Sequence, residues 1–349
     1  MLEDIIHQFF IYNPINLFHK IQSAHNGPSK TIAIIGATGI QGSSVTKVFL
    51  DLPGWTVRCI IRRATSNKAK ALAVLGAEVV QADLADVESL SCAFHGVNAI
   101  FVNTDFGELL TTALAAGTDQ TTSFQIAHDT ELRNANNAAI AASKIPGLER
   151  YVYSALGPVS AASNGKYSHS LHWESKAAAV NFVEKELPEL AKKASFIYIG
   201  VYNTNPFLYP QRNPQDGKYS LVLPAPKSTR FQIIDVARST GHYVRALVED
   251  EEPGTKLFAY EDDLTVAEII DVWSKVSGEK AQHVQMSIQS IHEISGVPVG
   301  FLEAAAYLTE YSYTAGLEGV ITPDKLKNKV HLPGYEEFLV SEGREKLLV

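Results

Sequence analysis

Residues 31–42, "TIAIIGATGIQG", decide the fold expected of this chain. The first five are apolar and mostly β-branched, which predicts a buried strand. Three glycines follow at Gly36, Gly39 and Gly42, and the stretch "IQGSSVTKVFLD" predicts a helix over 40–51. Glycine tolerates unusual backbone angles and lets a ligand come close to the backbone. The three glycines therefore serve either a tight turn alone or a turn that holds a phosphate group.

The position of these glycines between a strand and a helix favours the phosphate-binding turn. The first N–H groups of a helix have no partner within the helix, and the helix dipole is positive at that end, so an anion binds there. In a strand–helix–strand unit this is the site for the pyrophosphate of a dinucleotide. Gly42 is also expected to let the helix pack closely on the strand. The residues predicted to contact the dinucleotide here are Gly36, Thr38, Gly39, Ile40, Gln41 and Gly42.

Strand-like and helix-like segments alternate along the first two thirds of the chain. This alternation predicts an α/β fold of the Rossmann type, a doubly wound parallel sheet with helices on both faces. After Gly200 the chain becomes rich in loops and proline, although "QIIDVARSTGHYVRALVED" (232–250) predicts a helix. We expect a Rossmann domain over 30–200 and a smaller, mainly substrate-binding region over 201–349. Segments near 235–260, including a strand at 255–260, are expected to return to the Rossmann domain.

Residues 1–29 form an extension rich in Ile, Phe and Leu. Polar residues and Pro14 interrupt it, so no apolar run is long enough to span a bilayer. Its acidic start also differs from that of a signal peptide. We expect the extension to pack on the body of the protein or on a partner subunit, with a helix lying on a membrane surface as the alternative.

The 349-residue chain has a formal charge of -8 at pH 7 and two cysteines, Cys59 and Cys92. An acidic chain has no general attraction for phosphate backbones, so direct nucleic-acid binding is disfavoured. Two cysteines form no disulfide framework and suit a reduced, cytoplasmic compartment. The sequence has no residue spacing typical of a metal site. It also lacks the G-x-S-x-G motif of α/β-hydrolases and the Gly-Lys-Ser/Thr that ends a nucleotide-hydrolysing P-loop.

Arg62 and Arg63 follow the second predicted strand, residues 55–61. In a Rossmann fold this position lies beside the ribose of adenosine, where an acid suits the 2′-hydroxyl of NAD and an arginine suits the 2′-phosphate of NADP. No Asp or Glu occurs between Trp55 and Ala77. A guanidinium group can bind two phosphate oxygens at once. The sequence favours NADP(H) over NAD(H), unless these arginines merely end a strand in solvent.

Ligands of open α/β sheets bind beyond the carboxyl ends of the strands. Asp83 and Leu84 follow the third predicted strand and are expected to border the adenine ring. Residues 103–106, which include Thr104, follow the fourth strand and are expected on the adenosine and nicotinamide side. The next segment, "FGELLTTALAAG" (106–117), is expected either to form an apolar loop over the nicotinamide or to be a short helix at a subunit interface.

Five segments together resemble the NmrA-like proteins, which are atypical short-chain dehydrogenases/reductases, in a branch shared with isoflavone-reductase-like enzymes. They are "GATGIQG", "VRCIIRR", "LGAEVVQADLADVESLSCAFHGVNAIFVNT", "YVYSAL" and "HWESK", and the resemblance covers roughly residues 30–290. It implies a Rossmann domain with a smaller C-terminal substrate domain and a preference for NADP(H). Some relatives are reductases, whereas others bind the nucleotide without known turnover and act as redox-linked regulators of protein partners.

The segment "HSLHWESKAAAV" departs from the usual pattern of that superfamily, Tyr-x-x-x-Lys, in which the tyrosine exchanges a proton and the lysine holds the nicotinamide ribose. Here Lys176 is present, but His172 stands at the tyrosine position. Lys176 is expected to be a ribose ligand, an acid–base group or a surface lysine, and His172 a proton donor or a structural, substrate-lining residue. Tyr167 could offer a replacement hydroxyl, whereas Tyr151 and Tyr153 are expected in the core.

The segment "GVYNTNPF" (200–207) resembles the part of the family that lines the substrate cleft. Tyr202, Asn203 and Asn205 would supply hydrogen bonds, and Phe207 an apolar wall. The favoured function is an NADP(H)-dependent oxidoreductase of the NmrA-like type that reduces a small organic substrate. The alternative is a non-catalytic NADP(H)-binding redox sensor that regulates a protein partner. A homo-oligomer is also compatible with the sequence.

Overall fold

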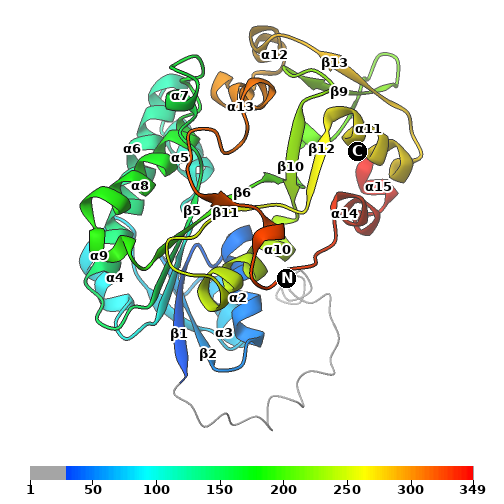
Figure 1. The fold of residues 1–349 in the computed structure, drawn as a ribbon. Coiled ribbons are helices and arrows are strands. Elements are labelled where there is room, and N and C mark those ends of the chain that lie inside the picture. Colours follow the sequence, from blue (N-terminus) through cyan, green and yellow to red (C-terminus); the bar gives the residue numbers. More distant parts are fainter. Residues whose placement is uncertain (1–28, 349) are drawn as a thin grey trace.

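The computed structural model describes residues 29–348, so the predicted packing of the N-terminal extension lies outside the described residues. A parallel sheet of eight strands lies at the centre, in the order β14-β11-β6-β5-β4-β1-β2-β3 (Figure 1). In chain order these strands are β1 (Lys30–Ile35), β2 (Trp55–Ile61), β3 (Glu78–Gln81), β4 (Ala99–Val102), β5 (Arg150–Ala155), β6 (Ala194–Ile199), β11 (Lys256–Ala259) and β14 (Val320–Ile321). The order from β3 to β6 is the doubly wound arrangement that the alternation predicts.

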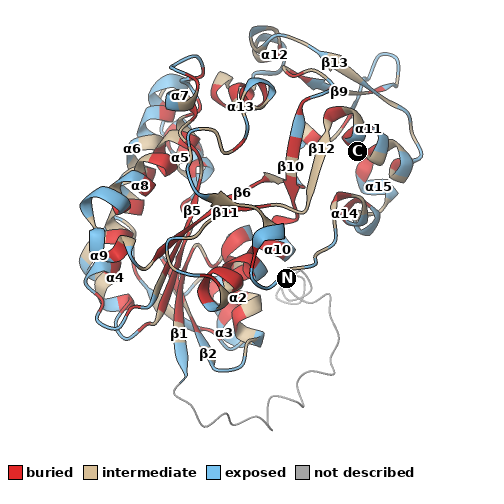
Figure 2. Ribbon diagram, viewed as in Figure 1, coloured by how far each residue is buried: buried red, intermediate tan, exposed pale blue. Residues whose placement is uncertain are grey.

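Helices cover both faces of this sheet. Alternate residues of a strand point to opposite faces, so Ile32 and Ile34 pack on one side and Ala33 and Ile35 on the other. The first face is covered by α2 (Ile40–Asp51), α3 (Asn67–Val74) and α10 (Val236–Arg245). The second is covered by α4 (Val87–Ala93), α6 (Gln120–Ser143), α8 (Leu171–Glu186) and α9 (Pro188–Ala191). Because both faces are covered, the inner strands β4, β5 and β6 are almost entirely buried, whereas the edge strands β3 and β14 are partly exposed (Figure 2).

Local signals set several helix ends. The Ser66 hydroxyl accepts a hydrogen bond from the Ala69 N–H at the start of α3, and the Asp86 carboxylate accepts two from the first turn of α4. These side-chain oxygens satisfy N–H groups that have no partner within the helix. Helix α2 spans the predicted residues 40–51, and α8 ends before Pro188.

Helix α10 brings a segment from late in the chain onto α2 (Figure 1). The contact depends on Gly241, where a Cβ would lie 2.3 Å from the carbonyl oxygen of Ser44. The Gly241 N–H also donates to Ser44 Oγ at 2.9 Å. Strand β11 pairs with β6 in the main sheet, as expected of the strand near 255–260. The division of the chain into two domains stays a prediction.

The helix expected over 232–250 was placed too early. Residues 232–234 belong to β10 (Arg230–Ile234), and α10 begins only after Asp235, whose carboxylate accepts the Arg238 N–H at 3.2 Å. A π-helical turn, η4 (Ala246–Asp250), continues α10. The short apolar run suits a strand as well as a helix, and its pairing with two neighbouring strands decides the outcome.

The segment 106–117 is a helix, α5 (Phe106–Ala115), and not a loop. The Asp105 carboxylate caps it by accepting the Glu108 N–H at 3.0 Å. Phe106 packs with Phe124 of α6, so the apolar residues of this segment contribute to a small core of their own.

The C-terminal region contains two small sheets, formed by β12-β10-β7 and β13-β9-β8. Their remaining strands are β7 (Val201–Tyr202), β8 (Gln211–Arg212), β9 (Tyr219–Leu223), β12 (Asp262–Thr265) and β13 (Ala281–Gln285). The helices are α11 (Val266–Ser277), α12 (Ile288–Ser295), α13 (Val299–Glu310), α14 (Tyr335–Glu342) and α15 (Arg344–Leu347). They enclose a second core around the fully buried Trp273. The short helices α7 (Val159–Ala162), η3 (Pro206–Leu208) and η5 (Pro323–Lys325) complete the chain.

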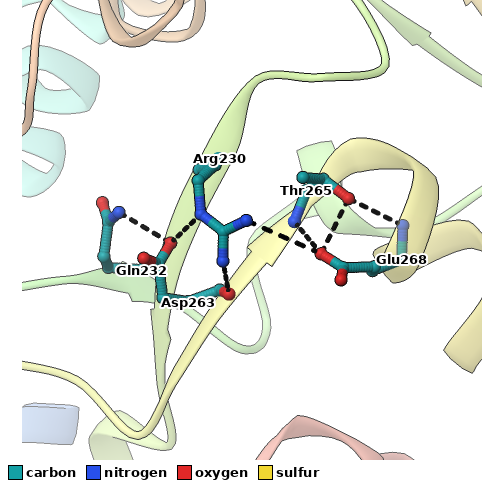
Figure 3. Close-up of polar contacts among 5 residues, drawn as sticks. All are labelled: Arg230, Gln232, Asp263, Thr265 and Glu268. Carbon is teal, nitrogen blue, oxygen red and sulfur yellow. Dashed lines mark hydrogen bonds and ion pairs between the residues drawn. The ribbon is translucent and has the colours of Figure 1, made fainter.

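Polar side chains reinforce the pairing of β10 with β12 (Figure 3). Asp263 Oδ1 accepts hydrogen bonds from Arg230 Nε at 3.0 Å and from Gln232 Nε2 at 2.9 Å. Thr265 and Glu268 form a capping box at the start of α11. The end of β12 and the beginning of α11 are thus held together by side chains that satisfy backbone groups. Among residues 29–348, no helix combines the length and apolar character needed to cross a bilayer.

Candidate functional site

The glycine turn has the geometry of a phosphate-binding turn. Gly36 ends β1 with a φ of 79°, and its carbonyl accepts the Gly39 N–H at 2.9 Å. A Cβ on Gly42 would lie 2.2 Å from the same carbonyl oxygen, so a side chain there would push α2 away from the strand. Gly39 caps α2 without a side-chain hydrogen bond, which leaves the first N–H groups of the helix for a ligand. Thr38 lies within this turn and is partly buried.

A cavity of about 610 Å³ lies at the carboxyl ends of β1, β4, β5 and β6. It brings together many of the predicted site residues: Gly39, Ile40, Gln41, Thr104, His172, Lys176, Tyr202, Asn205 and Phe207. The C-terminal region adds apolar wall residues that the sequence analysis did not identify: Phe231, Phe301, Ala304, Ala305, Leu308 and Tyr313. Helix α13 supplies most of them, and its short apolar pattern gave no sign that it would face a cavity rather than a core.

Lys176 is buried beneath the cavity and bound to three acceptor atoms. Its Nζ donates to the backbone carbonyl of Thr104 at 3.0 Å and to Thr104 Oγ1 at 2.9 Å. It also forms an ion pair with Glu131 Oε1 at 3.0 Å, and Glu131 is fully buried on α6. The Ser175 hydroxyl donates to the other carboxylate oxygen. Two of the three ammonium donors are thus used in hydrogen bonds to Thr104, and the ion pair with Glu131 adds a charge partner. Lys176 is therefore no surface lysine.

Glu131 is a residue of the candidate site that sequence reasoning missed. It lies in the middle of the long helix α6, and a glutamate in a helix is usually exposed to solvent. Only the packing of α6 against α8 brings its carboxylate to Lys176.

His172 lies in the cavity wall among aromatic rings. Its ring centroid is 5.0 Å from that of Phe301 and 5.8 Å from that of Phe106. Burial, together with the charge of Lys176, lowers the pKa of His172 to about 3. The ring is therefore neutral at physiological pH, a state that suits a wall residue better than a proton donor. Within the described residues, its Nδ1 has no hydrogen-bond partner.

Tyr202 joins the predicted substrate segment to the glycine turn. Its hydroxyl oxygen accepts a hydrogen bond from Gln41 Nε2 at 2.5 Å, and both side chains line the cavity. Burial raises the pKa of Tyr202 above its ordinary value. Asn205 Oδ1 accepts the Phe207 N–H at 2.9 Å and so starts the short helix η3. Asn205 and Phe207 both line the cavity, and their contact with a substrate stays a prediction.

Asn203 does not line the cavity, which corrects one of the expected substrate contacts. It is 1% exposed, and its backbone is fixed by Ile234 and Tyr209 at 2.8 and 2.9 Å. Asn203 lies in the turn that follows β7, which ends at Tyr202, and it is absent from the residues that line the cavity.

The other tyrosines also take definite places. Tyr167 is not a replacement hydroxyl for the site, because it donates to Glu310 Oε1 at 2.8 Å and lies outside the cavity lining. Burial and this hydrogen bond raise its pKa to about 12. Tyr151 and Tyr153 are buried in the core, as predicted.

Arg62 and Arg63 follow β2 and are exposed, outside the cavity lining. The Arg62 guanidinium is ion-paired with Glu108 in the first turn of α5, and the two side chains are 62% and 53% exposed. The hydrogen bond to Glu108 raises the pKa of Arg62, and the nearby charges of Asp83 and Asp105 act in the same direction. The arginine expected to meet a 2′-phosphate is thus surrounded by carboxylates.

Asp83 and Leu84 lie just beyond the carboxyl end of β3. Asp83 Oδ1 accepts the Ala85 N–H at 2.9 Å, and the Leu84 carbonyl accepts a hydrogen bond from Asn137 at 2.9 Å. They lie at the same edge of the sheet as the glycine turn, but they do not line the cavity. Their contact with an adenine ring stays a prediction.

Known structures share this fold. The chain superimposes on the leucoanthocyanidin reductase–NADPH complex from Vitis vinifera with a TM-score of 0.66, at 13% identity over 91% of this chain and 99% of that one. It superimposes on the negative transcriptional regulator NmrA in complex with NADP with a TM-score of 0.59, at 19% identity over 92% and 91% of the two chains. Both neighbours were solved with this cofactor.

Sequence comparison gives the family. An oxidoreductase of Aspergillus hancockii, hkm9, is 27% identical over 283 residues, 77% of this chain and 79% of that protein, and is described as containing an NmrA-like family domain. The first relatives of the same description align over only 22–24% of their own length, at 44–47% identity. The sequence profile of the NmrA-like family matches residues 28–339. With a match over almost its whole length, the chain belongs to the NmrA-like family.

Proposed function

We propose that this protein is an NADP(H)-dependent reductase of a small organic substrate. The observation that carries the proposal is that one cavity joins the start of α2, at Gly39 and Gln41, to the buried Lys176. The turn suits a pyrophosphate, since the first N–H groups of α2 carry no side-chain cap and the N-cap Gly39 is exposed.

Each part of the cofactor then has a set of residues to hold it. The pyrophosphate would lie on Gly36, Thr38 and the start of α2, and the adenine between the strand ends at Asp83 and Leu84. Arg62 and Arg63 would hold the 2′-phosphate, with Arg62 exchanging Glu108 for it. Lys176 and Thr104 would hold the nicotinamide ribose. When bound, NADPH supplies a hydride to an electrophilic carbon in the cavity.

The cavity lining indicates the kind of substrate. Phe207, Phe301 and Leu308 provide apolar walls, and His172 adds a neutral ring. Few polar groups converge on the space, so it suits an apolar molecule with one reducible C=O, C=N or conjugated C=C group. Such walls also exclude water, which strengthens the electrostatic effect of the Lys176 charge.

Two related proteins support the assignment to the reductases. Hkm9 is named an oxidoreductase, and leucoanthocyanidin reductase was solved with NADPH. We propose a cytoplasmic location, because the chain has only two cysteines and no disulfide framework, which suits a reduced compartment.

Oxidation of NADPH by the pure protein, measured with a panel of enones, imines and quinones, tests the proposal. Lys176→Ala is expected to abolish turnover of any accepted compound. Lys192→Ala is the matched control, because Lys192 is an exposed lysine paired with Glu189 far from the cavity. An equal rate in the wild type and the Lys176 variant would overturn the assigned role of Lys176.

The second candidate is a non-catalytic NADP(H) sensor that controls a protein partner, with or without self-association. It is favoured by the neutral His172 at the position of the usual catalytic tyrosine, and a structural neighbour, NmrA, is titled a negative transcriptional regulator. Tight NADPH binding without turnover of any compound in the panel, together with a partner recovered in a nucleotide-dependent pull-down, would establish it.

A further inference from the structure

Reduction of a polar double bond requires a proton as well as a hydride. In this site the two residues at the usual catalytic positions are poorly placed to give one. Lys176 Nζ already donates to two oxygen atoms of Thr104 and is ion-paired with Glu131. His172 is neutral at physiological pH, because its pKa is lowered to about 3 by burial and by the Lys176 charge.

The tyrosines near the cavity differ in what their hydroxyl groups already do. Tyr313 lines the cavity, but its hydroxyl donates to the Ile199 carbonyl at 2.5 Å. Tyr153 is 1% exposed and lies outside the lining. Tyr202 lines the cavity and accepts from Gln41 Nε2, so its own hydrogen stays available for a ligand.

The position of this hydroxyl suits proton transfer. Gln41 belongs to the first turn of α2, and its hydrogen bond holds the Tyr202 oxygen in the same cavity that Lys176 lines. Burial raises the pKa of Tyr202, with smaller contributions of the same sign from Asp105 and Glu131, and keeps the phenol protonated between turnovers. The hydrogen bond from Gln41 and the nearby Lys176 charge act in the opposite direction. A charge of that sign stabilises the phenolate that forms when the proton leaves.

We propose that Tyr202 is the proton donor of this site and replaces the tyrosine that is absent at position 172. The proposal rests on the reductase function above, with NADPH as the reductant. A hydride adds to the carbon of a C=O or C=N group, and the π electron pair moves to the heteroatom. The heteroatom takes the proton of the Tyr202 hydroxyl, and water reprotonates the phenolate. NADPH, substrate and one proton thus give NADP⁺ and the reduced product.

Tyr202→Phe tests this, because it removes the hydroxyl and keeps the ring. For the compound of the panel that the wild type reduces fastest, kcat should fall about 100-fold or more, the contribution expected of a general acid. The dissociation constant for NADPH, from the change in its fluorescence on titration, should stay at the wild-type value. Tyr209→Phe is the control, since the Tyr209 hydroxyl donates to the Asn203 carbonyl at 2.9 Å outside the cavity lining; its kcat should stay close to wild type.

The outcomes separate this inference from the proposed function. Undiminished kcat in Tyr202→Phe, with an active wild type, overturns the donor role alone. A loss of NADPH affinity that accounts for the whole loss of rate makes Tyr202 a cofactor ligand and also overturns it. A wild type that binds NADPH but reduces none of the compounds overturns the reductase proposal, and the donor role with it.

Discussion

The two ends of the proposed cofactor site each contain a cation paired with a glutamate, and the two pairs differ in exposure. Lys176 and Glu131 are 11% and 0% exposed, whereas Arg62 and Glu108 are 62% and 53% exposed. The buried pair connects α8 to α6. Water has little access to it and so cannot take the place of either charged partner. The exposed pair ties α5 to the end of β2 in water, where a pair is worth little. The contrast suggests a fixed charge at the nicotinamide end and an exchangeable one at the adenosine end.

The buried pair gives the largest expected effect. Glu131→Ala leaves the Lys176 charge buried without its partner, and breaking a buried pair in this way costs about 3–5 kcal/mol of unfolding free energy. Glu108→Ala should cost less than about 1 kcal/mol, since that pair is exposed. Urea denaturation of the two variants checks both values. Equal stabilities would contradict the comparison. The double variant Glu131→Leu with Lys176→Met, which removes both charges, should recover part of the loss.

At the adenosine end, Arg62 and Arg63 should affect the preference for NADPH over NADH more than the stability of the fold. Replacing Arg62 and Arg63 together with alanine removes charge-assisted hydrogen bonds worth about 1.5–3 kcal/mol. NADPH affinity is therefore expected to fall about tenfold to a hundredfold, while NADH affinity changes little. Calorimetric titration with both nucleotides measures the two losses. If NADH binding weakened as much as NADPH binding, the arginines would not select the 2′-phosphate.

The smallest effect is expected from the partner of Arg62. Glu108→Gln removes the carboxylate that competes with a 2′-phosphate, so NADPH should bind about two- to fivefold more tightly, the range of an exposed ion pair. Because the pair is exposed, the gain should shrink as salt is added. Glu189→Gln serves as the control, since Glu189 is an exposed glutamate paired with Lys192 at 2.6 Å on α9. A gain of the same size in the control, or a gain for NADH as well, would argue against competition at Arg62.

Local features of the candidate site were predictable from the sequence, whereas features that depend on distant residues were not. Gly36, Gly42 and the ends of α2 were predicted because a positive φ, a close backbone approach and an apolar period are local properties of the sequence. Residues 232–234 were misassigned as helix because a short apolar run is ambiguous until its neighbours pair with it. Asn203 was wrongly placed at the substrate because its burial depends on hydrogen bonds of its backbone to Ile234 and Tyr209, which the local sequence does not reveal.

By itself, the sequence determined the alternation of strands and helices, the glycine turn and the residue types at the strand ends. These follow from hydrophobic period and backbone freedom, which act over a few residues. Only the tertiary structure decided that Glu131 meets Lys176, that Glu108 meets Arg62 and that Tyr202 meets Gln41, 161 residues away in the chain. The local sequence around a glutamate or a tyrosine is compatible with solvent or with a cavity, and the packing of distant helices and strands selects between them.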